Sequence, residues 1–194
     1  DMRVDVKAAC GAKEFIAEFS RAAKKNKRTD RSSWLAKCRE WKRRYPVGLG
    51  ALERPAGLVN TYSLVSALSD LMTGRDVLVP GSSGACAEVT MQAFRVKPGQ
   101  RVLNTPGLGS MGFGLPAASG ACIASGRRTV TIVGDGGLQH NIQALETIRR
   151  LDLPLKVFVL NNAGYGSIRI MQKKHFNSNY VCCDAASGMS IPDV

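Results

Sequence analysis

The stretch TVTIVGDGGLQHNIQALETI, residues 129–148, decides the fold of this chain. Residues 129–133 are all β-branched, which is typical of a strand. After the glycines, Ile142, Leu145 and Ile148 recur at a helical spacing. An Asp-Gly hairpin would need a second alternating strand at this point, so the pattern favours a turn from a strand into a helix.

This turn contains one carboxylate, Asp135, at the carboxyl end of the predicted strand. Open α/β sheets bind ligands at this end, where backbone N–H groups at the start of the next helix are free to donate. Asp135 is therefore a candidate ligand-binding residue. A purely structural turn is the alternative, and this stretch alone leaves it open.

From residue 57 onward, predicted helices and strands alternate. The helices are expected at 62–72, 87–94, 114–125 and 141–151, and the strands at 76–81, 101–107, 129–136 and 155–162. This order predicts an α/β fold, a doubly wound and mostly parallel sheet with helices on both faces. Continuous apolar strands such as TVTIV agree with burial on both sides.

The expected domain organisation has three parts. Residues 1–32 form the tail of a central domain, with a strand at 2–8 and an amphipathic helix at 12–25. Residues 33–56 form a serine-capped helix and a linker. Residues 57–194 form the α/β domain, which is C-terminally incomplete because no further helix or strand long enough to close the sheet is expected after residue 162. We therefore expect a fragment of a larger protein.

Composition excludes several classes of protein. The net charge of +12 is concentrated in the first 50 residues, which hold 14 Lys/Arg against 6 Asp/Glu. The basic run at 21–31 lacks the interleaved aromatic residues that stack bases, so no nucleic-acid partner is expected. No apolar run approaches the roughly 18 residues of a membrane span, so no membrane partner is expected either. The six cysteines show no C-x-x-C spacing, which favours reduced thiols and a cytoplasmic protein.

Three glycine-rich stretches follow predicted strands, at 104–114, 133–137 and 161–167. Because parallel strands end at one edge of a sheet, these stretches are expected to converge. Glycines admit a ligand close to the backbone, while Asp135 and Asn162 offer oxygen ligands that suit magnesium. Together they predict a site for a phosphate group with a divalent cation.

A dinucleotide site is the rival interpretation. Gly107, Gly109 and Gly112 spell G-x-G-x-x-G between a strand and a helix, with Asp135 after the next strand, as in NAD-dependent Rossmann dehydrogenases. A ribose-binding acid, however, needs neither the glycines around Asp135 nor the pair Asn161–Asn162.

The spacing of the motifs favours the first interpretation. Gly-Asp-Gly at 134–136, then residues 137–160, which number 24, and then Asn-Asn resembles the diphosphate-binding motif of thiamine-diphosphate enzymes. GLGSMGFGLPAA (107–118), the stretch from 134 to 162 and the upstream helix ending in WKRRYP are similar to the acetolactate synthase branch. The similarity runs from about residue 33 to 175.

This resemblance implies a set of site residues. Asp135, Asn162 and the backbone carbonyl of Gly164 would hold Mg²⁺. The backbone of Gly136, Gly137, Tyr165 and Gly166 would face the diphosphate of thiamine diphosphate, and Gly109, Ser110 and Met111 would contact its aminopyrimidine ring. FAD is known among such enzymes but is not indicated by this stretch.

The resemblance also implies an activity: thiamine-diphosphate- and Mg-dependent decarboxylation of a 2-oxo acid, expected to be pyruvate, with carboligation to a carbonyl acceptor. A decarboxylase or a sugar-pathway carboligase is the alternative. The family's activating glutamate would come from an N-terminal domain, absent here, of a neighbouring subunit in a homodimer or homotetramer. No catalytic residue is therefore assigned, and the isolated chain is expected to be inactive.

The chain departs from the family pattern at several positions. Gly137 stands where the family usually has serine, and Ala85, Cys86, Glu88 and Val89 stand where synthases carry Gln-His and Met-Trp pairs. The acceptor and product are therefore not predicted. Arg169 either faces the substrate carboxylate or forms a surface salt bridge, and His140 is expected to be a surface or packing residue.

Overall fold

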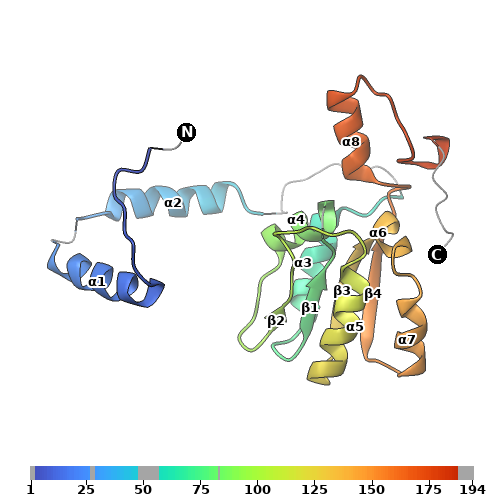
Figure 1. Ribbon diagram of the computed structural model, residues 1–194, viewed down its shortest axis with the longest axis horizontal. Helices are drawn as coiled ribbons and strands as arrows, with labels where there is room; N and C mark the ends of the chain where they lie inside the picture. Colours follow the sequence, from blue (N-terminus) through green and yellow to red (C-terminus); the bar gives the residue numbers. More distant parts are fainter. Residues whose placement is uncertain (1–2, 27–28, 48–56, 83, 188–194) are drawn as a thin grey trace. The chain divides into compact units, whose positions relative to one another are not determined.

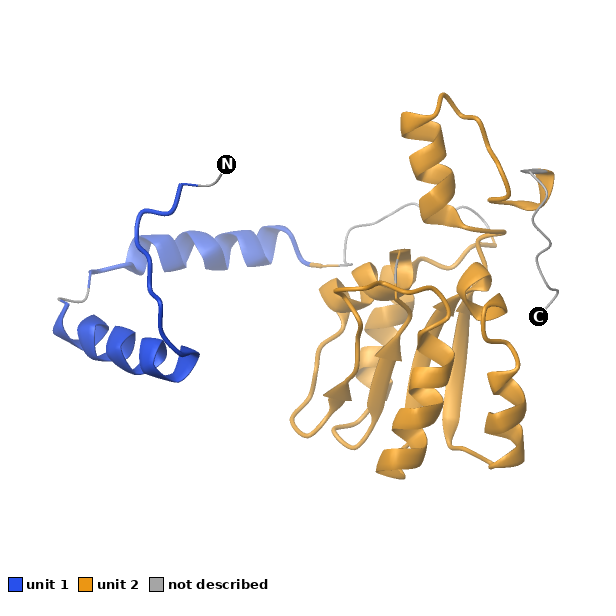
Figure 2. Ribbon diagram, viewed as in Figure 1, with its two compact units in different colours: residues 1–46 blue, residues 47–194 orange. Residues whose placement is uncertain are grey.

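The computed structural model describes residues 3–26, 29–47, 57–82 and 84–187 of the 194-residue chain. The chain divides into two compact units, residues 1–46 and 47–194 (Figure 2). Each unit is described by itself. The expected domain boundaries at 32 and 56 stay a prediction, and residues 48–56 of the expected linker lie outside the described part of the chain.

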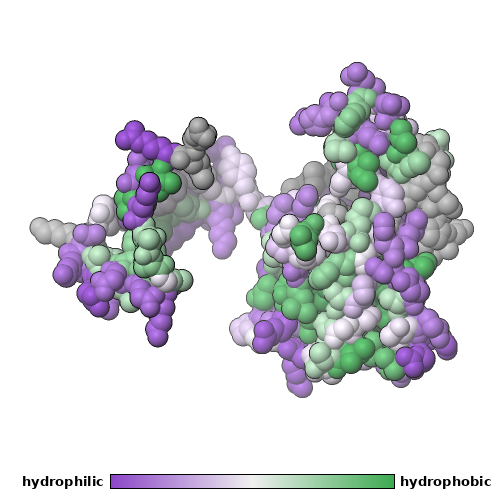
Figure 3. Space-filling view, in the orientation of Figure 1, coloured by the Kyte–Doolittle hydropathy of each residue, from purple (hydrophilic) through white to green (hydrophobic). Residues whose placement is uncertain are grey.

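The first unit contains two helices, α1 (Ala12–Lys25) and α2 (Ser32–Arg44), and neither buries a residue. Apolar and hydrophilic side chains lie side by side on its surface (Figure 3). The prediction of α1 is confirmed. The strand expected at 2–8 is wrong for residues 3–8, which form no strand because no described segment pairs with them.

The start of α2 also differs from expectation. Ser32 is the first helical residue rather than the cap. The carboxylate of Asp30 accepts hydrogen bonds from the Ser32 N–H at 2.9 Å and from its hydroxyl at 3.0 Å. An acid near a helix start also interacts favourably with the helix dipole, so Asp30 takes the role that the serine was expected to play.

The second unit is built on a four-stranded sheet. Its strands are β1 (Val77–Pro80), β2 (Arg101–Val102), β3 (Thr129–Gly134) and β4 (Leu155–Leu160). They are all parallel, in the order β2-β1-β3-β4. The predicted α/β fold with a parallel sheet is confirmed, and the Asp-Gly hairpin is excluded because β3 and β4 run in the same direction.

Helices cover both faces of this sheet (Figure 1). On one face, α3 (Thr61–Leu71) and α4 (Gly84–Ala93) pack on Leu78 and Ile132. On the other, α5 (Gly114–Ser125) and α7 (Ala144–Arg150) pack on Val79, Leu155 and the strands around them. Alternate residues of each central strand therefore enter opposite halves of the core, which is the doubly wound arrangement.

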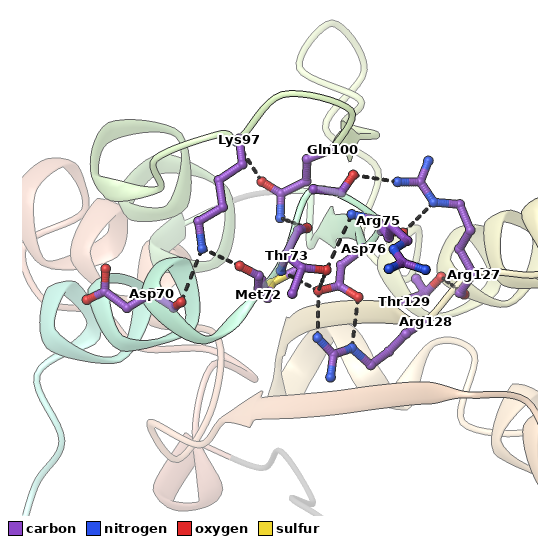
Figure 4. Close-up of polar contacts among 11 residues, drawn as sticks. Asp70, Met72, Thr73, Arg75, Asp76, Lys97, Gln100, Arg127, Arg128 and Thr129 are labelled. Atoms are coloured by element: carbon purple, nitrogen blue, oxygen red, sulfur yellow. Dashed lines mark hydrogen bonds and ion pairs between the residues drawn. The ribbon is translucent and has the colours of Figure 1, made fainter.

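A polar network joins the turns at the amino-terminal edge of the sheet (Figure 4). The buried carboxylate of Asp76 accepts two hydrogen bonds from Arg128, at 2.8 and 2.6 Å, and one from the Thr73 N–H at 2.6 Å. Arg127 donates to the carbonyls of Gly74 and Gly99 at 2.8 and 2.9 Å. These contacts fasten the turn before β1 to the turns before β2 and β3.

The structure corrects three expectations about elements. The strand expected at 101–107 is only two residues long. The glycine-rich turn after β3 is already helical, because α6 (Asp135–Gln139) begins at the carboxylate itself. After residue 162, where no helix or strand long enough to close the sheet was expected, the chain forms the ten-residue helix α8 (Gly166–His175) and the short 3-10 helix η1 (Ala185–Ser187). No helix in the described ranges is long and apolar enough to cross a membrane.

Candidate functional site

The end of β3 places Asp135 at the first position of α6, with only 2% of its surface exposed. One carboxylate oxygen accepts a hydrogen bond from the Gly136 N–H at 2.8 Å. The other accepts from the Gly164 N–H, also at 2.8 Å. The second contact joins two loops that are 29 residues apart in the chain, and it forms because β3 and β4 are neighbours with Gly134 paired to Leu160.

The loop after β4, residues 161–165, has an unusual backbone. Ala163 has a φ of 59° and Gly164 a φ of 131°, which few residues other than glycine adopt. The Tyr165 N–H donates to the Cys183 carbonyl at 2.8 Å, and the Gly166 N–H donates to the Gly164 carbonyl at 3.0 Å. A carbonyl oxygen has two lone pairs, so that of Gly164 keeps one for another partner.

These loops surround a cavity of about 150 Å³. Eight of the ten predicted site residues line it, namely Met111, Asp135, Gly136, Gly137, Asn162, Gly164, Tyr165 and Gly166. Gly109 and Ser110 do not line it: Gly109 turns the chain with a φ of 59° and Ser110 is exposed. The structure thus brings the predicted metal and diphosphate residues together, and leaves two of the three predicted ring-contacting residues outside the cavity.

Glycine is present at the positions of the site for different physical reasons. A Cβ at Gly136 would overlap the ring of Tyr165, and one at Gly166 would come within 2.7 Å of the Asn162 amide nitrogen. A Cβ at Gly137 would meet nothing within 4 Å. Gly136 and Gly166 are therefore fixed by packing inside the chain, whereas Gly137 leaves open space in front of its backbone.

Sequence reasoning missed several residues of the cavity wall. Gly81, Ser82 and Gly84 after β1, and Ser167 and Ile168 at the start of α8, also line it. The glycine-serine run after the strand at 76–81 carried the same signal as the other three stretches. Ser167 is the last residue of the predicted glycine-rich stretch 161–167, whereas Ile168 had no comparable signal.

The thiol of Cys86 lies in the cavity wall at the start of α4. Burial, together with the nearby charge of Asp135, raises its pKa to about 12. Cys86 therefore stays protonated near neutral pH and is neither a nucleophile nor a thiolate ligand.

Arg169 is not among the residues that line the cavity. Its guanidinium donates to the carbonyls of Asn162 and Ala163 at 3.1 and 3.3 Å and lies 3.7 Å from a carboxylate oxygen of Asp184. The ion-pair alternative is therefore the one that the structure favours, although this pair is only partly exposed. His140 is exposed, as expected, and its ring lies 3.4 Å from the Tyr165 hydroxyl.

The site's residues fit a hard cation with a diphosphate. Each oxygen of Asp135 accepts one hydrogen bond and has capacity for another partner. The described residues include no group of three or more His, Cys, Asp or Glu that could hold a metal ion. A metal here would thus need amide and backbone oxygens beside one carboxylate, and Asn162 and Gly164 offer them next to Asp135.

The dinucleotide interpretation does not fit the topology. A Rossmann site sets a short glycine turn between a strand and its helix, with the acid on the adjacent strand. Here residues 103–113 separate β2 from α5, and β1 lies between β2 and β3, so the G-x-G-x-x-G stretch and Asp135 follow strands that are not neighbours.

The sequence profile described as the C-terminal TPP binding domain of thiamine pyrophosphate enzymes matches residues 82–192. The chain belongs to this family. The matched range contains α4, the whole cavity wall from Ser82 onward and α8. The resemblance seen in the motifs is therefore confirmed.

Individual relatives agree with this family. The chain is 34% identical to the acetolactate synthase large subunit of Parasynechococcus marenigrum (strain WH8102), over 81% of this chain and 25% of that protein. It is 33% identical to the probable acetolactate synthase 2, chloroplastic, of Oryza sativa subsp. japonica, over 95% of this chain and 28% of that protein. The chain thus spans about a quarter of the length of these relatives.

A solved structure has the same fold. The thiamine diphosphate-dependent 4-hydroxybenzoylformate decarboxylase of Rhodococcus jostii RHA1 superimposes with a TM-score of 0.59 and is 25% identical. The match covers 75% of this chain and 27% of that one.

Proposed function

We propose that this chain supplies the diphosphate- and magnesium-binding part of a thiamine-diphosphate-dependent enzyme. The enzyme decarboxylates a 2-oxo acid, pyruvate in the first instance, and joins the remaining fragment to a carbonyl acceptor, as an acetolactate synthase does. The similarity to two proteins named as acetolactate synthases supports the proposal.

One observation carries this proposal. The Asp135 carboxylate at the end of β3 accepts a hydrogen bond from the Gly164 N–H in the loop after β4. The predicted metal ligands of the two connections therefore lie at one cavity. Magnesium prefers oxygen ligands, and this contact brings a carboxylate, the Asn162 amide and a free backbone lone pair to the same wall.

The proposed roles of the chain's residues are those of a binding site. Asp135, Asn162 and the Gly164 carbonyl would hold Mg²⁺, while the backbone at Gly136, Gly137, Tyr165 and Gly166 would face the diphosphate. When bound, thiamine diphosphate supplies the electron sink that makes loss of CO₂ from a 2-oxo acid feasible. The chain orients the reactants, and the buried Asp135 carboxylate would bind the cation.

A second candidate is a decarboxylase that releases an aldehyde without joining it to an acceptor. The solved structure of similar fold is that of a 4-hydroxybenzoylformate decarboxylase, which favours this candidate. The cavity wall carries Ala85 and Cys86, two small side chains that leave room for an acceptor, and this favours carboligation. A sugar aldehyde as acceptor belongs to the same carboligase proposal.

Calorimetric titration with thiamine diphosphate tests the proposal. We expect binding with MgCl₂ that weakens at least tenfold in EDTA, and loss of the magnesium dependence in Asp135→Ala. A matched control, Asp152→Ala, changes an exposed acid in the turn before β4 and should bind as the wild type does. A thiamine diphosphate Kd that is the same with MgCl₂ and with EDTA, or NADH binding that is retained in Asp135→Ala, would overturn the proposal.

The proposed assembly is a homodimer or homotetramer in which each active site is shared between subunits. Product analysis with pyruvate and varied aldehyde or 2-oxo acid acceptors, on the enzyme in its assembled form, separates the two candidates. A carboligase gives an acceptor-dependent hydroxyketone, and a decarboxylase gives only the free aldehyde.

A further inference from the structure

The loop that carries Asn162 and Gly164 needs support to keep its shape. Its residue Ala163 has a φ of 59°, a left-handed conformation that is unfavourable for a residue with a side chain. Such a conformation persists only where the surroundings determine it. The contacts that hold this loop therefore decide where its ligand atoms lie.

Two of these contacts use the backbone amides of the loop. The Gly164 N–H donates to Asp135 and the Tyr165 N–H donates to the Cys183 carbonyl, both at 2.8 Å. A Cβ at Gly164 would overlap the Cys183 carbonyl oxygen, so the segment around Cys183 lies directly against the loop.

The third contact uses the carbonyls of the loop, and Arg169 on α8 makes it. One guanidinium nitrogen donates to the Asn162 carbonyl at 3.1 Å and another donates to the Ala163 carbonyl at 3.3 Å. A planar guanidinium with several fixed N–H groups can hold two adjacent carbonyls at once, which fixes the peptide planes on either side of Ala163.

Asp184 fixes the guanidinium in turn. Its carboxylate lies 3.7 Å from Arg169, and the two side chains are 23% and 33% exposed. Partial burial makes such a pair stronger and less sensitive to salt than a surface pair. Because Asp184 follows Cys183, the same short segment holds the loop through a backbone carbonyl and, through Arg169, by an ion pair.

We propose that Arg169 is a positioning residue for the metal site, which it fixes by holding the carbonyls of Asn162 and Ala163 while pairing with Asp184. This inference rests on the proposed function, since the loop matters only if Asn162 and Gly164 ligate the metal. Arg169 itself is not among the residues that line the cavity. Outer-shell residues of this kind typically change metal affinity about 10- to 100-fold when removed.

The test compares magnesium dependence rather than activity. For each variant, calorimetry gives the ratio of the thiamine diphosphate Kd in EDTA to the Kd in saturating MgCl₂. We expect Arg169→Ala to lower this ratio about tenfold or more while the Kd in EDTA changes less than threefold. Arg169→Lys should be intermediate, because an ammonium is a point charge that lacks the planar fork.

Two further variants complete the design. Asp184→Asn keeps the shape of the side chain, removes the ion pair and should lower the ratio about threefold, which keeps the test valid if Arg169→Ala does not fold. Arg149→Ala is the control, because it removes an exposed arginine that pairs with Glu146 on α7, away from the loop.

The outcomes distinguish failure of the positioning role of Arg169 from failure of the proposed function. If the wild type binds with magnesium dependence but Arg169→Ala keeps its ratio, or both constants weaken equally with a lower thermal midpoint, Arg169 has no positioning role. If the wild-type chain shows no magnesium-dependent binding at all, the proposed function fails and this inference fails with it.

Discussion

At the scale of single residues, the shape of the site depends on the contacts that hold its backbone as much as on its polar side chains. Asp135 was predicted from its place after a strand, and Asn162 from its spacing to Asp135. The contacts of Arg169 with the loop could not be predicted, because they depend on the left-handed turn at Ala163 and on Asp184, fifteen positions later in the chain (184 minus 169).

Gly136 and Gly137 give a matched pair of substitutions. Gly136→Ala should lower the free energy of unfolding by about 1–3 kcal/mol, because the new Cβ overlaps the Tyr165 ring. Gly137→Ala meets nothing and lies within α6, so it should change stability by about 1 kcal/mol or less, in the stabilising direction. Urea denaturation of both variants measures the difference; equal costs would contradict the packing account.

The thiol of Cys86 predicts a dependence of stability on alkaline pH. Its folded pKa of about 12 lies above its ordinary value of 9.0, so its contribution is complete below pH 9 and is lost as pH rises from 9 towards 12. In this window the wild type should lose about 1.4 kcal/mol per pH unit more than Cys86→Ala does.

Denaturant titrations at several alkaline pH values give this difference directly. Cys10→Ala is the control, because Cys10 is exposed and lies outside the cavity wall. Parallel pH profiles for the wild type and Cys86→Ala would contradict the assignment.

At the scale of elements, the strands β1, β3 and β4 were predicted well, and the short strand β2 and the short helices poorly. Runs of β-branched residues such as 129–133 report burial on both faces directly, so β1, β3 and β4 were found. The helix α8 was not, because it buries no residue and so has no apolar stripe facing a core. The strand predicted at 101–107 is shorter than expected, because only Arg101 and Val102 pair with β1 and the local pattern does not show where the pairing ends.

The turns at the amino-terminal edge of the sheet depend on the contact between Arg128 and Asp76. Arg128→Ala should cost about 1–3 kcal/mol, because it leaves a buried carboxylate with only the hydrogen bonds from Thr73. The exposed pair of Arg149 with Glu146 provides the control, and Arg149→Ala should leave the free energy of unfolding nearly unchanged.

The same contact has a pH signature. The Arg128 guanidinium holds the pKa of Asp76 below its usual value, so the pair stabilises the fold above about pH 4 and this contribution is lost as pH falls through the lowered pKa. The destabilisation by Arg128→Ala should therefore shrink in acid. A cost that is constant from pH 7 to pH 3 would show that the charge of Asp76 plays no part.

At the scale of the whole molecule, the parallel sheet brings together the loops that the sequence pattern predicted to converge. The parallel strands β3 and β4 end at the same edge, so the turn after β3 and the loop after β4 lie at one cavity. The hydrogen bond from the Gly164 N–H to Asp135 joins the two directly. The residues that match the family profile, 82–192, include both of these connections. The roles of Asp135, Asn162 and Gly164 as metal ligands stay a prediction.

A crystal structure of the protein grown with thiamine diphosphate and Mn²⁺, with anomalous data, tests that prediction most directly. We predict one strong anomalous peak about 2 Å from a carboxylate oxygen of Asp135, the amide oxygen of Asn162 and the carbonyl oxygen of Gly164, with the diphosphate beside Gly136 and Gly137. A Mn²⁺ ion bound elsewhere, with thiamine diphosphate in the cavity and no metal at Asp135, would contradict the account.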